Sequence, residues 1–293
     1  MKQMLLLASV AMAAAMPHRA DAQTYKFQRI SYQKGDGAAM SDINVKSIMT
    51  GGYFSSISSV RACFLYDAKT KSKTPLSDPN AVSGTECWGI NDAGNVVGDY
   101  IDVNGNYIGY MDIGGTFSDV TPPGSTKTVV YGISNNNVVG GYYVDSSGNQ
   151  YGFLYDGTTY TTVKIKGDTT VQVFGIDSAG DYTVSATNPK TGTVSFYYTA
   201  AGKSTPIVFP SAAQTAAHHL NDAGLVAATW IDSSSVEHGG VWNSTTNTYV
   251  SLDYPHSPVA TIADGVNAAG VVVGRYESST TGQSYGYRAV PAT

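Results

Sequence analysis

Charged residues are scarce in this chain, and the familiar short catalytic motifs are missing. Only 13% of the 293 residues are charged, and 17 Lys and Arg stand against 22 Asp and Glu, which gives a net charge of -5. The chain therefore has no basic stripe that would neutralise phosphates, which excludes a nucleic-acid binder. It also lacks the glycine-rich phosphate loops, the H-E-x-x-H zinc motif and the G-x-S-x-G nucleophile motif.

Long apolar runs are confined to the amino-terminal end. The first residues carry Lys2, an apolar stretch from Leu5 to Met16 and the small-x-small sequence Ala20-Asp21-Ala22. This order predicts a signal peptide over residues 1–22. The stretch is shorter than the roughly 20 apolar residues that cross a bilayer, and no other stretch reaches that length. We therefore expect an exported protein, extracellular or periplasmic, without a membrane span.

Cysteine occurs only twice, at Cys63 and Cys87. In the oxidising environment outside the cytoplasm, such a pair forms a disulfide more often than a redox or metal site. The sequence therefore predicts a Cys63–Cys87 disulfide. It predicts no metal and no cofactor.

Glycine and tyrosine are plentiful, with 32 and 21 copies, and they recur in a repeat. Residues 89–124 and 132–167 share one order: a GIN-like start, a VVG run and a D-x-x-G turn. Aligning the chain on the apolar residue of the GIN-like start gives six repeats, which begin at Ile43, Ile90, Ile133, Ile176, Leu220 and Val266. A repeat of this length must be considered before any local motif, because it determines the fold.

Each repeat alternates apolar and polar residues over short runs, with Asn, Asp, Gly and Ser clusters between them. This pattern is typical of strands joined by hairpins, and it indicates four antiparallel strands per repeat. Four strands form one blade of a β-propeller, which buries its faces against neighbouring blades. We therefore predict an all-β, six-bladed β-propeller of four-stranded antiparallel blades, which forms a single domain over residues 23–293.

The two ends of the chain carry complementary fragments of the repeat. The sixth repeat, Val266–Thr293, has no segment for a fourth strand. The segment Tyr25–Tyr32 is predicted to form a single strand before the first repeat. We expect this amino-terminal strand to complete the last blade, because the pairing removes two open sheet edges. A pair of β-sandwiches, the main rival fold, does not explain these complementary ends.

The repeat resembles that of the bacterial extracellular HAF-repeat family. The likeness rests on the order GIN-x-x-G-x-VVG-x-Y, then D-x-x-G, then a triplet that contains an aromatic residue and precedes Leu-Tyr. The likeness is best in residues 89–160 and 264–290. The His-Ala-Phe triplet of the family is degenerate here, and only His238 keeps its histidine. The resemblance implies a secreted, propeller-like repeat protein and assigns no activity.

All four histidines of the mature chain fall within 39 residues around the fifth repeat: His218, His219, His238 and His256. Together with Glu237 they are candidate catalytic residues, because imidazole and carboxylate groups serve acid-base and metal chemistry. In a propeller, these residues are expected on or near the face that carries the inter-blade loops, where binding sites usually lie. The alternative is structural, with His218 and His219 on opposite faces of a strand.

Aromatic residues recur at one position of the second strand: Tyr53, Tyr100, Tyr142, Trp230 and Tyr276. Trp88, Tyr131 and Phe174 recur before the glycine of the GIN-like start. Aromatic rings arranged around a propeller can stack on sugar rings, so the first set is our candidate ligand-binding set. The alternative is that these rings pack the blades against each other.

These observations favour a monomeric, secreted binding protein whose inter-blade loop face recognises an extracellular glycan or a surface protein. The first alternative is an extracellular hydrolase or lyase that uses the histidines of the fifth blade. The second is a structural surface protein. The sequence leans against an enzyme, because no nucleophile motif supports one.

Overall fold

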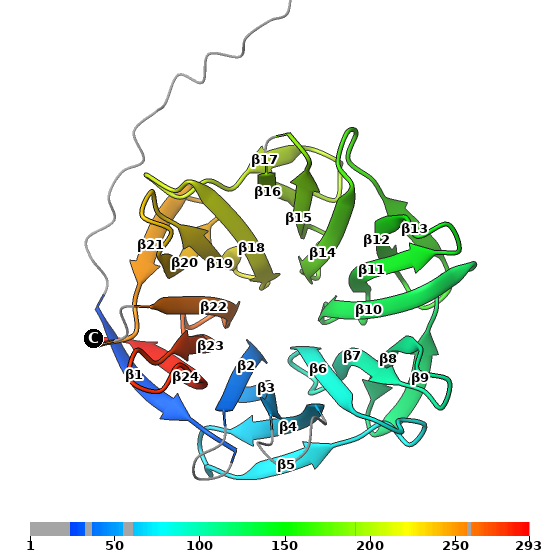
Figure 1. Cartoon of the computed structure of the whole chain (residues 1–293), viewed down its shortest axis with the longest axis horizontal. Coiled ribbons are helices and arrows are strands. Elements are labelled where there is room, and N and C mark those ends of the chain that lie inside the picture. The colour runs from blue at the N-terminus through cyan, green and yellow to red at the C-terminus, as the bar shows by residue number, and fades with distance from the viewer. Residues whose placement is uncertain (1–23, 33–36, 55–60, 191, 257–258, 293) are drawn as a thin grey trace, which may run out of the picture.

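The structure is a computed structural model of the whole chain, and it describes residues 24–32, 37–54, 61–190, 192–256 and 259–292. The predicted signal peptide, residues 1–22, lies outside the described residues. Every element in the described part of the chain is a β-strand, so no helix there is long and apolar enough to cross a membrane. The strands form a ring of sheets around a central axis (Figure 1).

Four of the sheets are separate, four-stranded and antiparallel. The first sheet contains β2 (Gly37–Ile43), β3 (Ile48–Phe54), β4 (Arg61–Asp67) and β5 (Lys73–Leu76). The second contains β6 (Thr85–Ile90), β7 (Val96–Ile101), β8 (Tyr107–Ile113) and β9 (Thr116–Val120). The third contains β10 (Ser125–Ile133), β11 (Val139–Asp145), β12 (Gln150–Tyr155) and β13 (Tyr160–Val163). The fourth contains β14 (Thr170–Ile176), β15 (Tyr182–Asn188), β16 (Gly192–Tyr198) and β17 (Ser204–Pro206).

The remaining eight strands form one sheet. One four-stranded half contains β18 (Gln214–Leu220), β19 (Leu225–Ile231), β20 (Glu237–Asn243) and β21 (Thr248–Leu252). The other half contains β22 (Ala260–Val266), β23 (Val272–Glu277), β24 (Ser284–Pro291) and β1 (Tyr25–Ile30).

The number of separate blades differs from the prediction. The sequence predicts six separate four-stranded blades, whereas the structure has four separate four-stranded sheets and one eight-stranded sheet. The difference has a local cause, because a single parallel pairing of Glu237 in β20 with Ala260 in β22 joins the two antiparallel halves. Non-local pairing of this kind leaves no periodic signal in the sequence.

The predicted pairing of the two chain ends is present. Strand β1 lies antiparallel to β24, with Tyr25 opposite Pro291 and Ile30 opposite Gly286. The amino-terminal strand therefore completes the last four-stranded half, and the ring closes by a non-covalent contact (Figure 1).

The core lies between neighbouring sheets, and large side chains of the third strands occupy it. Phe64, Tyr110, Phe153 and Tyr287 are all fully buried. Tyr110 donates a hydrogen bond to the Glu86 carbonyl, and Tyr287 donates one to the Ile262 carbonyl. These tyrosines thus fill the space between strands while their hydroxyls satisfy inner-strand carbonyls, as buried tyrosine requires.

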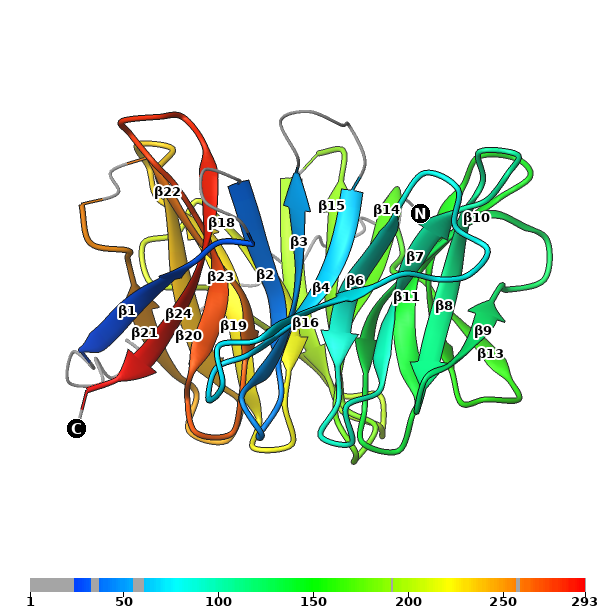
Figure 2. The same ribbon diagram turned by 90° about the horizontal axis from the view of Figure 1, so that it is seen from below.

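The connections between strands gather at the two faces of the ring (Figure 2). We call the face with the connections between sheets, such as β5–β6 and β9–β10, the loop face. The face with the turns from first to second strand, such as β2–β3 and β6–β7, is the hairpin face. The strands nearest the axis are β2, β6, β10, β14, β18 and β22 (Figure 1). Each of these inner strands leads into a first-to-second-strand turn, so it runs from the loop face to the hairpin face.

The predicted disulfide is present and joins the first two sheets. Cys63 of β4 and Cys87 of β6 have Cα atoms 5.5 Å apart, and both residues are buried. The bond therefore ties one sheet covalently to its neighbour.

Replacing both cysteines by alanine is expected to lower the free energy of unfolding by about 3 kcal/mol, because the unfolded chain loses a cross-link between residues 24 positions apart. Denaturant unfolding of the double variant and of the oxidised protein measures the difference. Equal midpoints with equal slopes would show that this tether is dispensable.

Candidate functional site

A β-bulge near the end of every inner strand shapes the central axis. The register with the second strand shifts between Met40 and Asp42 in β2, and between Cys87 and Gly89 in β6. The other four inner strands have the same irregularity. A bulge re-aims side chains, so two successive residues of each strand face the axis instead of one. The residues nearer the loop face are Ser41, Trp88, Tyr131, Phe174, His218 and Asp264, and those nearer the hairpin face are Asp42, Gly89, Gly132, Gly175, His219 and Gly265.

The hairpin-side position is glycine in four strands because the inner strands approach closely there. A Cβ atom added to Gly132 would lie 2.2 Å from the Phe174 carbonyl oxygen, and one on Gly175 would lie 2.2 Å from the Leu220 nitrogen. Neither contact is sterically possible without movement of backbone. Asp42 and His219 are the two side chains at this level, and they occupy the middle of the ring.

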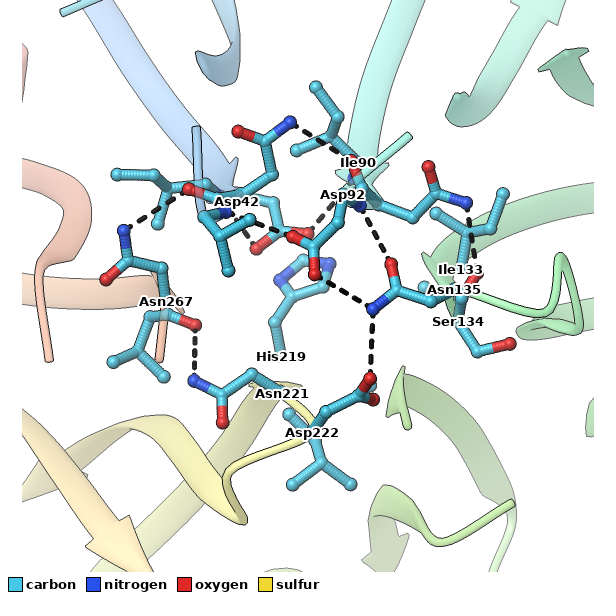
Figure 3. A pocket seen from close by; sticks show the side chains of 18 of the residues that line it. Asp42, Ile90, Asp92, Ile133, Ser134, Asn135, His219, Asn221, Asp222 and Asn267 are labelled. Atoms are coloured by element: carbon cyan, nitrogen blue, oxygen red, sulfur yellow. Dashed lines mark hydrogen bonds between the residues drawn. The ribbon is translucent and has the colours of Figure 1, made fainter. Parts of the chain in front are cut away.

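His219 lies in the middle of the ring near Asp42 (Figure 3), and its two ring nitrogens contact two other inner strands. Its Nδ1 lies 2.9 Å from the Asp264 carbonyl oxygen of β22, and its Nε2 lies 2.9 Å from the Tyr131 carbonyl oxygen of β10. Carbonyl oxygens only accept hydrogen bonds, so both ring nitrogens must donate, which requires the protonated imidazolium. His219 therefore carries a positive charge that bridges three inner strands.

Asp42 supplies the opposite charge beside it. One carboxylate oxygen accepts a hydrogen bond from the Ile43 amide at 2.8 Å, and the other accepts one from the Ile90 amide at 3.1 Å. Burial raises the pKa of Asp42, and the neighbouring His219 opposes that rise. Burial by itself would lower the pKa of His219, but Asp42 and the two carbonyl oxygens outweigh it, so the pKa of His219 is raised above its ordinary value.

The turns of the hairpin face form a closed set of contacts around this pair. The side-chain amide of Asn44 donates to the Asn91 carbonyl at 3.0 Å, and that of Asn91 donates to the Ser134 carbonyl at 3.1 Å. Asn267 donates to the Asn44 carbonyl at 3.2 Å and so links the last repeat to the first. The Asn of the GIN-like start is thus an inter-sheet tie, a role that our sequence reasoning missed although the repetition of Asn was visible.

A second layer of polar contacts lies outside the first (Figure 3). The amide nitrogen of Asn135 donates to carboxylates of both Asp92 and Asp222, each at 2.9 Å. The hollow at this end measures about 60 Å³. The hairpin end of the axis is therefore a polar seal with room for a few water molecules.

The loop side of the axis has a different character, because aromatic side chains line it. The rings of Trp88 and Tyr131 lie edge to face with centroids 5.5 Å apart, and those of Tyr131 and Phe174 stack at 4.5 Å. The rings of Phe174 and His218 lie edge to face with centroids 5.3 Å apart. All four side chains are partly exposed. The indole of Trp88 donates to Asp99 at 2.8 Å, which fixes its orientation.

The row of aromatic rings continues into charged residues. Nδ1 of His218 lies 3.9 Å from an Asp264 carboxylate oxygen, and the other oxygen of Asp264 lies 3.2 Å from Nη1 of Arg275. Burial lowers the pKa of His218 to about 4, so this imidazole is neutral at pH 7. We call Trp88, Tyr131, Phe174, His218 and Asp264 the axial arc.

A cavity of about 290 Å³ adjoins the axial arc at His218. Its lining includes Thr193, Gln214, Thr229, Glu237, Ile262 and Arg275. It is the larger hollow next to the axis by far, compared with the 60 Å³ at the hairpin end.

The four histidines do not gather at one point. His218 and His219 both face the axis, because the bulge between Ala217 and Leu220 overrides the strict alternation that would send them to opposite faces. His219 lies at the sealed hairpin end, not at the expected loop face. The His238 ring stacks on the Trp230 ring with centroids 4.2 Å apart, and its Nδ1 lies 3.0 Å from a carboxylate oxygen of Asp253. His256 is exposed in a loop. Among the described residues, no three His, Cys, Asp or Glu side chains could hold a metal ion together.

The aromatic set of the second strands packs between strands. Tyr100, Tyr142 and Tyr276 are buried, with 4%, 8% and 7% of their surface exposed. Tyr53 stacks on Tyr32 at 4.0 Å, and Tyr276 stacks on Tyr254 at 3.6 Å. Trp230 is covered by His238. All five side chains thus make contacts within the fold, and Tyr53 and Trp230, like the rings of the axial arc, are partly exposed.

Comparison with known proteins supports the fold and leaves the activity open. No protein-family model matches the chain, and no curated protein matches it. Among solved structures, TolB from Acinetobacter baumannii is similar with a TM-score of 0.54 and 11% identity over 87% of this chain and 64% of that one. The β-propeller domain of the Trilobed protease from Pyrococcus furiosus is similar with a TM-score of 0.50 and 9% identity over 85% and 94%. At these identities the likeness shows a β-propeller fold alone.

The imidazolium of His219 makes the stability of the ring depend on pH. A group whose pKa is raised on folding contributes stability below its unfolded pKa, near 6.5, and loses it as pH rises through the higher folded pKa. We expect the free energy of unfolding to fall across that alkaline window. His219→Gln, which cannot donate to both carbonyls and leaves Asp42 unpaired, should lose about 3–5 kcal/mol at pH 7 and should also lose the His219-dependent part of the slope.

Denaturant unfolding at a series of pH values measures both effects. The matched control is His256→Asn, which removes an exposed histidine and keeps a residue type that tolerates the positive φ of 60° at that position. This control should unfold as the natural protein does. An unchanged pH slope in His219→Gln would refute the assignment of an imidazolium at the axis.

Proposed function

We propose that this chain is an exported, six-bladed β-propeller of the HAF-repeat type that binds an extracellular glycan at the loop end of its axis. The two four-stranded halves of the eight-stranded sheet support the count of six, because each half has the strand order of the separate sheets. The signal-like amino terminus and the disulfide between Cys63 and Cys87 support export.

The axial arc is the observation that carries the proposal. Trp88, Tyr131 and Phe174 present partly exposed aromatic rings at the axis, and the apolar faces of sugar rings stack on such surfaces. His218, Asp264 and Arg275 follow at one end of the arc and offer hydrogen-bond partners for sugar hydroxyls. The hairpin end, by contrast, is closed by His219, Asp42 and the Asn ties.

An extracellular hydrolase or lyase receives less support. The histidines are divided among the sealed end of the axis, the axial arc, the Trp230 contact and an exposed loop. Burial lowers the pKa of His218, which adjoins the larger cavity, to about 4, so at neutral pH this imidazole is unprotonated and cannot serve as a general acid. A purely structural surface protein would leave the partly exposed rings of the axial arc without a role.

A glycan array followed by titration of the strongest oligosaccharide tests the proposal. Phe174→Ala should weaken binding about tenfold, because one stacking ring contributes roughly 1–1.5 kcal/mol. The matched control is Tyr155→Ala, which also removes a stacked ring, the one paired with Tyr160 at 4.1 Å in the third sheet, but at a position away from the axis.

Thermal unfolding of both variants separates lost binding from lost folding. If the axial arc binds the glycan, Phe174→Ala loses affinity at a temperature at which this variant is folded, while Tyr155→Ala keeps the affinity of the natural protein. The proposal fails when no glycan binds, or when both variants lose affinity equally.

A further inference from the structure

The cavity beside His218 lies where the fourth sheet meets the two halves of the eight-stranded sheet, around the start of β18. Thr193 comes from β16, Gln214 from β18, and Ile262 and Arg275 from β22 and β23. Its volume of about 290 Å³ is near the lower end of the roughly 300–1,000 Å³ of ligand pockets. Because His218 belongs to both, the cavity is continuous with the axial arc.

The charges around this cavity do not balance. The lining contains His218, Glu237 and Arg275, and Asp264 contacts two of these residues. Arg275 is paired with Asp264 at 3.2 Å, so these two charges offset each other. His218 is neutral at pH 7. The main chain of Glu237 pairs with Ile231 and Ala260, but within the described part of the chain its carboxylate has no hydrogen-bond or ion-pair partner. This carboxylate leaves one net negative charge.

Neutral polar groups accompany that charge. The hydroxyl of Thr229 is buried and has no hydrogen-bond partner among the described residues, although buried hydroxyls normally have one. Gln214 is exposed and adds an amide donor and acceptor. Ile262, which is 8% exposed, supplies an apolar wall. A ligand that suits this lining combines hydroxyl groups, an apolar face and one positive charge.

We propose that the cavity is a subsite for a sugar residue with a free amino group, whose ammonium pairs with Glu237. This proposal rests on the glycan-binding function and names the class of glycan. A sugar carboxylate would meet the unpaired Glu237, and Arg275 is already paired with Asp264, so repulsion selects against acidic sugars. The ring hydroxyls of the sugar pair with the exposed amide of Gln214, while the next residue of the glycan extends over Phe174.

Two oligosaccharides that differ only in the amine test the proposal. Glucosamine oligomers carry an ammonium on each ring, whereas N-acetylglucosamine oligomers of the same length and linkage are neutral. We expect the natural protein to bind the glucosamine oligomer about tenfold more tightly in calorimetric titrations at pH 6, because one charged hydrogen bond contributes that much. Glu237→Gln, which keeps the size of the side chain, should abolish the preference.

Asp102→Asn is the matched control for overall charge. One carboxylate oxygen of Asp102 accepts hydrogen bonds from the backbone amides of Asn104 and Asn106 in a hairpin turn of the second sheet, and the side-chain oxygen of asparagine accepts both. The other oxygen accepts a bond from the Asn106 side chain, which asparagine loses at this exposed turn. The variant therefore removes one negative charge away from the cavity and keeps the backbone contacts of the turn, and it should keep the tenfold preference.

The outcomes separate this proposal from the general one. Equal affinity for the two oligomers, a preference for an oligouronate, or a preference that survives Glu237→Gln would overturn the amino-sugar subsite while glycan binding stands. Loss of the preference in Asp102→Asn would show that the preference for the glucosamine oligomer arises from the overall charge of the protein, which would also overturn the subsite. Absence of any oligosaccharide binding would overturn both proposals, and binding of a lysine-rich peptide that depends on Glu237 would assign the cavity to a protein ligand instead.

Discussion

The close approach of the inner strands at the axis is the constraint on which the rest of the structure depends. Each strand carries a bulge that directs two residues inward, and at the tighter level four of the six positions are glycine. The two exceptions, Asp42 and His219, carry opposite charges and fill the middle. Removing one member of such a buried pair leaves the other charge unpaired and destabilises the protein, so Asp42 and His219 stabilise the ring only as a pair.

This arrangement gives the two ends of the axis different capabilities. At the hairpin end, the side chains of Asn44, Asn91 and Asn267 are committed to neighbouring sheets. At the loop end, three of the six inward residues are partly exposed aromatic rings, Trp88, Tyr131 and Phe174, and the nearby Thr229 hydroxyl has no hydrogen-bond partner among the described residues. The glycan site that we propose therefore lies at the loop end, whereas the side chains of the hairpin end hold neighbouring sheets together.

Two non-covalent contacts and one covalent contact resist opening of the ring. Strand β1 on β24 joins the chain ends, the disulfide joins the first two sheets, and the Glu237–Ala260 pairing merges the last two halves. The merged halves also flank the cavity beside His218.

The sequence by itself determined the repeat, the strand-turn pattern within it, the pairing of the chain ends and the disulfide. These features depend on local periodicity, turn residues and composition, which are all visible along the chain. Only the tertiary structure decided that His218 and His219 share one side, that His219 is charged, and that Tyr100 and Tyr142 are buried while Phe174 is partly exposed. Those outcomes depend on a bulge and on contacts between sheets far apart in sequence, and neither follows from alternation of residues along a single strand.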